Sequence, residues 1–182
     1  MKNPIWCAVT DISGICSINK YNSPWKSLRH VYKCNVAGYF IREKPRWSNR
    51  GLYTEHLSKQ KMLTRYPNLE IEDQVKFAYN AGDFMISGTC DGIGTDRTTK
   101  ERFVLEYKER SRCLLGVKIH DLCQCQFYMF ISGIHQTLFI ESYGDESEVF
   151  LIKYDKEFIN KYLQILKDRM EKVIEGLGRD LR

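Results

Sequence analysis

The chain has 182 residues, of which 43% are hydrophobic and 13% aromatic, and its 28 Lys and Arg against 23 Asp and Glu give a net charge of +5. This length supports one well-packed domain and is short for two. The mild basic excess excludes neither a polyanionic partner nor an ordinary basic protein, but the lack of any run of 18 apolar residues in the sequence argues against a membrane-spanning helix. Seven cysteines without a paired framework, and no signal-peptide pattern, predict an intracellular protein, cytoplasmic or nuclear.

The first third of the chain offers one clear helix signal and one basic segment. Residues 1–22 contain short apolar pieces without period, for which we expect strand or irregular structure and assign no chemistry. Ser23 followed by Pro24 opens a helix to about residue 34. Arg46 and Arg50 belong to a basic segment, residues 42–50, that surrounds Trp47; it is either a solvated loop or a contact for a nucleic-acid backbone or terminal phosphate.

A helix over residues 49–65, capped by Ser48, places Glu55 on its apolar stripe. Burying an unpaired carboxylate costs several kcal/mol, so such a residue normally meets a cation, a metal ion or hydrogen-bond donors. Lys59, four residues on, provides the simpler explanation, an ordinary ion pair along the helix.

Two strands flank a Gly-rich turn in the middle of the chain. After a predicted strand over residues 69–79, residues 83–89 form another strand, which ends near Asp91. Residues 102–109 alternate apolar and polar with a period of two, so Glu106 and Lys108 project together from one strand face. If the strands at 83–89 and 102–109 pair as a hairpin, Asp91 and Glu106 converge at one end of the sheet.

Two carboxylates beside a lysine make a magnesium site with an amine that acts as a general base or orients water. The alternative is structural, because a Glu-x-Lys pair in a strand is usually a solvated pair on the sheet surface.

The segment after this strand predicts a buried helix over residues 121–132, capped by Asp121. Gln124 fits a capping box with Asp121, whereas Gln126 has no such structural role and is expected to reach the acidic site or a phosphate. Cys123 and Cys125 are two residues apart, and such helical positions point about 200° apart. Buried thiols are therefore favoured over a zinc or iron–sulfur site built with Cys113 and His120.

The C-terminal third predicts two strands and a long helix. Residues 137–142 and 148–154 are separated by a Gly-Asp turn, and Asp155 caps an amphipathic helix whose apolar face is core packing. We expect this helix to end at Gly176 and Gly178.

The order of these motifs over residues 48–132 resembles the PD-(D/E)XK nuclease superfamily, and within it the lambda-exonuclease-like and RecB-like branch of phage and viral recombination exonucleases. The resemblance implies an α/β (α+β) fold with a central mixed β-sheet flanked by helices, as in restriction endonucleases. It also implies a single domain over residues 1–182, with a core at about 48–177 and an N-terminal accessory segment at 1–47.

The resemblance assigns a role to each matching residue. The metal ligands it implies are Asp91, Glu106, Glu55 and the carbonyl of Tyr107. Lys108 matches the lysine that positions the attacking water. The helix motif Gln-x-x-x-Tyr falls on Gln124 and Tyr128, with Gln126 as the alternative in a shifted register. One position departs from the pattern, since Cys90 stands where the family has its proline.

The implied activity is hydrolysis of phosphodiester bonds with Mg²⁺ or Mn²⁺, in a DNA exonuclease of the viral or phage recombination and repair type. Arg46 and Arg50 are candidates for nucleic-acid binding. Two alternatives stay open: an endonuclease on the same fold, and a domain that only binds nucleic acid. The expected partners are DNA, with RNA as the alternative, and a further copy of the chain or a recombination partner protein; no membrane partner is expected.

Overall fold

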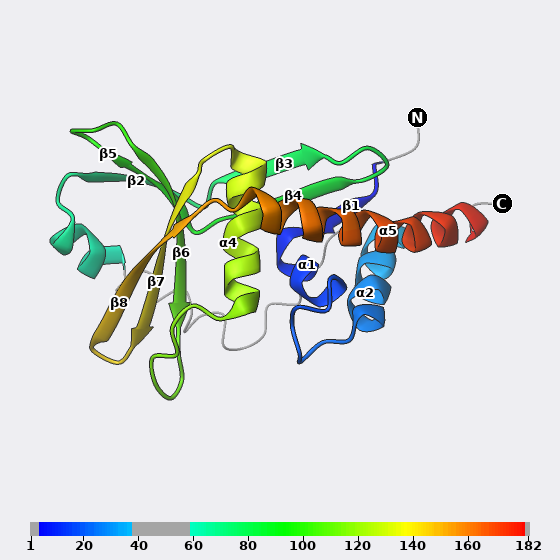
Figure 1. Ribbon diagram of the computed structural model, residues 1–182, viewed down its shortest axis with the longest axis horizontal. Helices are drawn as coiled ribbons and strands as arrows, with labels where there is room; N and C mark the ends of the chain where they lie inside the picture. Colours follow the sequence, from blue (N-terminus) through cyan, green and yellow to red (C-terminus); the bar gives the residue numbers. More distant parts are fainter. Residues whose placement is uncertain (1–3, 38–58, 181–182) are drawn as a thin grey trace.

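The computed structural model describes residues 4–37 and 59–180, and it contains two mixed sheets flanked by helices (Figure 1). The five-stranded sheet has the order β2-β5-β6-β7-β8, with bounds Leu69–Asp73, Gly92–Asp96, Arg102–Glu109, Gln136–Tyr143 and Glu146–Lys153. The three-stranded sheet has the order β1-β4-β3, with bounds Trp6–Ala8, Met85–Thr89 and Lys76–Asn80. The helices are α1 (Val9–Ile15), α2 (Pro24–Val36), α4 (Ile119–Ser132), α5 (Lys156–Asp180) and a short helix within residues 59–65.

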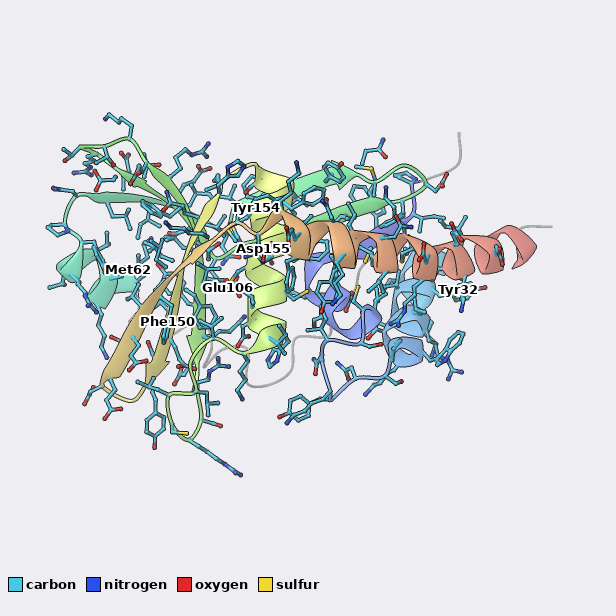
Figure 2. All side chains as sticks on the ribbon, in the orientation of Figure 1. Tyr32, Met62, Glu106, Phe150, Tyr154 and Asp155 are labelled. Carbon is cyan, nitrogen blue, oxygen red and sulfur yellow. The ribbon has the colours of Figure 1, made fainter. Side chains whose placement is uncertain are left out.

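Helix α4 lies centrally, with the five-stranded sheet on one side and α1 and α2 on the other (Figure 1). The larger hydrophobic core joins α1, α2, α4 and α5 to the three-stranded sheet and to the near face of the five-stranded sheet. A smaller core occupies the opposite face of the five-stranded sheet, where Met62 packs with Leu105 and Tyr107 (Figure 2). Burying both faces of β6 fixes its register, because a slip by one residue would exchange its two faces.

The predicted strand over residues 69–79 is two strands in two sheets. Gln74 has a φ of +52°, which breaks the extended backbone between β2 and β3. The Gln74 amide still donates to the Asp91 carbonyl at 3.0 Å, and the Cys90 amide donates to the Val75 carbonyl at 3.1 Å. The segments β2–β3 and β4–β5 therefore form one bent antiparallel ribbon that passes from one sheet into the other.

Because of this bend, the prediction that the strand at residues 83–89 pairs with the Glu106 strand is wrong. That segment is β4, which pairs with β1 and β3, whereas β6 pairs with β5 in a segment predicted to be a turn. Because Gly92 of β5 lies opposite Leu105, Asp91 still arrives beside Glu106.

The N-terminal segment is partly helical, which corrects the expectation of strand or irregular structure over residues 1–22. Helix α1 buries Val9, Ile12 and Ile15 in the larger core, and β1 runs parallel to β4. The predicted start of α2 is confirmed, since Ser23 Oγ accepts a hydrogen bond from the Lys26 amide at 3.3 Å. The boundary expected near residue 47 stays a prediction.

Two helix boundaries differ from prediction and one is confirmed. Helix α4 begins at Ile119 after Lys118, so Asp121 lies in its first turn and is not its cap. Asp155 does cap α5, with Oδ1 accepting from the Phe158 amide at 2.9 Å. Helix α5 does not end at Gly176 but continues to Asp180. A Cβ at Gly176 would stand 3.1 Å from the Tyr32 ring, so the glycine allows α2 to approach α5 closely (Figure 2). None of the helices within the described residues has both the length and the apolar character needed to span a membrane.

Candidate active site

A polar cavity of about 400 Å³ lies between β6, α4 and α1, and we call it the acidic cavity. The five predicted site residues that line it are Asp91, Glu106, Lys108, Gln124 and Tyr128. They come from the β4–β5 link, from β6 and from α4, which are separate in sequence and meet only in the fold.

The pleat of β6 separates the functional side chains from the core-packing ones. Glu106 is 1% exposed and faces α4, whereas the Tyr107 side chain packs in the smaller core on the other face (Figure 2). The Tyr107 amide donates to Asp91 Oδ2 at 2.7 Å. The backbone of β6 thereby holds the Asp91 carboxylate beside Glu106.

Glu106, Lys108 and Gln124 form a closed triangle of polar contacts. Glu106 Oε1 lies 2.5 Å from Lys108 Nζ and accepts a hydrogen bond from Gln124 Nε2 at 2.7 Å. Lys108 Nζ also donates to Gln124 Oε1 at 3.4 Å. The side-chain amide of Gln124 thus both donates and accepts a hydrogen bond. The prediction that Gln124 forms a capping box is wrong.

The charges in the acidic cavity are strongly coupled. Burial raises the pKa of Glu106 to about 7, an effect that the Lys108 ammonium opposes and the Asp91 carboxylate reinforces. Burial also raises the pKa of Asp91, against the stabilising hydrogen bond from the Tyr107 amide. Burial alone would lower the pKa of Lys108, but the neighbouring carboxylates Glu106 and Asp91 outweigh it, and the pKa of Lys108 lies above its ordinary value. Lys108 is therefore an ammonium beside two carboxyl groups.

The acidic cavity has donor atoms that suit a hard divalent cation. Glu106 Oε2 is buried and has no hydrogen-bond partner among the described residues, although its sister oxygen has two. Such an oxygen is costly unless a cation or donor meets it, and Mg²⁺ and Mn²⁺ prefer carboxylate oxygens. Within residues 4–37 and 59–180, no group of three or more His, Cys, Asp or Glu side chains is arranged to hold a metal ion. Of the predicted carboxylate ligands, Asp91 and Glu106 line the cavity. The carbonyl of Tyr107 stays a predicted ligand.

Gln126 is a predicted site residue that does not line this cavity. Gln126 donates to the Lys153 carbonyl at 2.8 Å and accepts from the Asp155 amide at 2.8 Å, so it joins α4 to the β8–α5 junction (Figure 2). The prediction that Gln126 reaches the acidic site is wrong. Gln126 is two residues after Gln124 in the same helix, so its side chain points to the opposite side.

Glu55, Arg46 and Arg50 lie outside the described residues, and their roles stay predictions. Lys59, weighed as a helical partner of Glu55, forms an ion pair with Asp73.

Other residues line the acidic cavity that the sequence did not indicate. Thr10 and Ser13 of α1, and Asn19 after it, come from the segment to which no chemistry was assigned. Their hydroxyl and amide groups sit in a short apolar stretch without a motif, so the sequence offered no signal. His120 and Asp121, at the start of α4, also line the cavity.

A buried ion network supports the wall formed by the start of α4. Arg110 is 12% exposed and donates from a terminal guanidinium nitrogen to Asp121 Oδ2 at 2.8 Å and from Nε to Glu141. Glu141 Oε2 also accepts the amides of Leu115 and Gly116 at 2.9 and 2.8 Å. The network thus fixes the loop between β6 and α4, the two elements that supply most of the site.

Six of the seven cysteines are buried thiols, and Cys113 is exposed, which corrects the expectation of a buried thiol at that position. Cys90 donates its thiol to the Gly92 carbonyl at 3.3 Å, and burial raises the pKa of this thiol to about 12. Its amide donates to Val75, a bond that the proline expected at this position could not make. Cys123 and Cys125 are fully buried in α4, and burial raises the pKa of both thiols.

Comparison with known proteins identifies the fold. No protein-family model and no curated protein sequence matches the chain. The structure is similar to the alkaline exonuclease of Laribacter hongkongensis, with a TM-score of 0.75 and 12% identity over 96% of this chain and 92% of that one. A structure of the same enzyme in complex with dAMP gives a TM-score of 0.74. The phage-related exonuclease of Haemophilus somnus 129PT gives 0.71 at 14% identity, over 99% of this chain and 98% of that one.

At these identities the comparison establishes the fold. The predicted resemblance to the fold of the lambda-exonuclease-like PD-(D/E)XK proteins is confirmed, as is the fold class of mixed sheets flanked by helices. The single predicted sheet is, however, two sheets joined by the bent ribbon.

Proposed function

We propose that this chain is a metal-dependent nuclease that hydrolyses phosphodiester bonds, and that it acts on DNA as an exonuclease. The observation that carries the proposal is the Glu106 carboxylate, with one oxygen held by Lys108 and Gln124 and the other buried without a hydrogen bond from the described residues. The structural similarity to two exonucleases supports a nuclease on independent grounds.

Four residues that line the acidic cavity have a task in this proposal. Asp91 and Glu106 would hold Mg²⁺ or Mn²⁺, with Glu55 and the Tyr107 carbonyl as further predicted ligands. A bound divalent cation supplies charge neutralisation for a phosphodiester and lowers the pKa of a bound water. Lys108 orients the attacking water and offsets the negative charge that develops on the phosphate. Gln124 holds the Glu106 and Lys108 side chains in one arrangement.

The protonation states of Cys90 and Lys108 favour water as the nucleophile. A cysteine attacks as its thiolate, and burial keeps the Cys90 thiol next to Asp91 protonated. Lys108 is a charged ammonium held by Glu106, so it is poorly suited to attack phosphorus itself. Direct hydrolysis therefore fits the site better than a covalent intermediate.

The proposal is tested by nuclease activity on end-labelled linear DNA and closed-circular DNA, each with Mg²⁺ or EDTA. The variant is Lys108→Met, which removes the ammonium and keeps most of the side-chain length. Its matched control is Lys167→Met, on the exposed side of α5. We expect metal-dependent loss of linear DNA with circles spared, reduced about 10²- to 10⁴-fold by Lys108→Met and unchanged by the control.

The outcomes separate the alternatives. Nicking of circles would indicate an endonuclease on the same fold, and preferential degradation of an RNA control would replace DNA as the substrate. If the wild-type chain binds DNA and RNA but degrades neither, the catalytic proposal is wrong. Sedimentation of the active protein tests the expected assembly with a second copy of the chain.

A further inference from the structure

A second cavity, of about 680 Å³, adjoins the acidic cavity and has a different character. We call it the aromatic cavity, because Trp6 and Phe77 contribute to its lining. The two cavities share Val9, Thr10 and Thr89 together with Tyr128, so the same residues bound both. Tyr128 is fixed in this shared wall by its hydroxyl, which donates to the Thr89 carbonyl at 2.8 Å.

The three-stranded sheet forms part of the aromatic cavity through a row of small side chains. Ser87 of β4 pairs with Ala8 of β1 on one side and with Ala78 of β3 on the other. All three residues line the cavity. The sheet has β-branched and aromatic residues elsewhere, so three small side chains in register create room that larger residues would fill.

Trp6 and two basic residues extend the lining beside this row. Trp6 lies two residues before Ala8 in β1, and its backbone is fixed at both polar atoms: its amide donates to Asn35 Oδ1 at 2.8 Å and its carbonyl accepts from Asn35 Nδ2 at 2.9 Å. Lys76 and His30 place basic groups in the lining, on β3 and α2. A rigid aromatic wall with a few polar groups is the usual composition of a small-molecule site.

We propose that the aromatic cavity binds the nucleobase of the nucleotide next to the phosphodiester that is held in the acidic cavity. This inference rests on the proposed nuclease function and names what holds the substrate strand in register. The volume suits one nucleoside, since ligand sites measure about 300 to 1,000 Å³. Base stacking on aromatic side chains tolerates every base, as a nuclease without sequence preference requires. Because the two cavities share lining residues, a base in the aromatic cavity would lie close to its own phosphate in the acidic cavity.

The first test fills the cavity. Ala78 is exposed, so Ala78→Leu can occupy the space without disturbing the core, and Ala37→Leu is the matched control at an exposed alanine outside the lining. We expect Ala78→Leu to raise the KM for linear DNA about 5- to 100-fold, the loss of one stacked base, with kcat within a few fold. The control should leave both constants unchanged. An unchanged KM in Ala78→Leu, with the thermal midpoint of the wild type, would overturn the proposal.

A second test measures ligand binding to the aromatic cavity without catalysis. In EDTA, saturation-transfer NMR compares the binding of 2′-deoxyadenosine with that of 2-deoxyribose 5-phosphate. The nucleoside should bind the wild type and the Ala37→Leu control and bind Ala78→Leu and Trp6→Leu more weakly, and Trp6→Phe should restore its binding. If the sugar phosphate binds and the nucleoside does not, the cavity does not recognise a base and the proposal is wrong. Because this assay needs no hydrolysis, failure of the nuclease activity alone is distinguished from failure of the base site.

Discussion

Arg110→Met should destabilise the protein by leaving two buried carboxylates without their cation. The side chains of Asp121 and Glu141 are 4% and 0% exposed, so neither can turn to solvent when the guanidinium is removed. Methionine keeps most of the length of the arginine side chain, and the perturbation is therefore mainly electrostatic.

The size of the loss follows from the partners that remain. Removing one member of a buried ion pair typically costs about 3 to 5 kcal/mol. Glu141 would keep two backbone amide donors, and Asp121 would keep His120 at 3.6 Å, so neither carboxylate is left wholly without a partner. We therefore expect a decrease of about 3 kcal/mol in the free energy of unfolding, near the lower end of that range. For a chain of this length it corresponds to a fall of about 6 to 12 °C in Tm.

Urea unfolding followed by circular dichroism measures this loss, with Arg112→Met as the control at a neighbouring exposed arginine. The control should change stability by less than about 0.5 kcal/mol. The double variant Arg110→Met/Glu141→Gln should be more stable than Arg110→Met alone, because the buried negative charge at position 141 is removed. A loss below about 1 kcal/mol in Arg110→Met, or no recovery in the double variant, would refute the assignment of this network as a buried electrostatic support.

Three further predictions concern single positions. In EDTA, the folded state retains a proton on Glu106 up to about pH 7, whereas the unfolded state loses it near pH 4.5. The free energy of unfolding, measured with urea, should therefore fall by about 1 to 3 kcal/mol as pH rises between these values, and Glu106→Gln should make it nearly independent of pH across this range. Gly88→Ala should cost about 1 to 3 kcal/mol in the same assay, because its Cβ would stand 2.6 Å from the Tyr128 ring and 3.0 Å from Val9; a wild-type midpoint would contradict this packing. Gln126→Leu should lower Tm and spare residual nuclease activity below that temperature, whereas loss of activity at full stability would return Gln126 to the site.

Local patterns predicted the elements of the site well where one physical period dominated. Alternation along β6 placed Glu106 and Lys108 on one face, and the pleat of the observed strand does so. Asp155 was recognisable as a helix cap because a cap depends on a few neighbouring residues. Such features require no knowledge of which strand pairs with which.

Features that depend on distant partners could not be read locally. The bend at Gln74 comes from a residue at positive φ whose sequence neighbourhood continues the strand pattern, so one strand was predicted in place of two. Gln124 fits a local capping rule, but its amide is used by Glu106 and Lys108 from another element. Gly176 would end an isolated helix, yet α5 continues through it and packs there against Tyr32.

The acidic cavity is an arrangement that stability alone would not favour. Glu106 is buried with one oxygen lacking a hydrogen bond from the described residues, beside a second carboxylate at Asp91. Lys108 compensates only part of this cost, since burial still raises the pKa of Glu106. The Arg110 network, whose partners Asp121 and Glu141 lie 11 and 31 residues along the chain, supplies the rigidity that keeps α4 and β6 in place around these charges. A fold that tolerates an uncompensated carboxylate oxygen at the meeting point of two rigid elements has the property expected of a site completed by a cation.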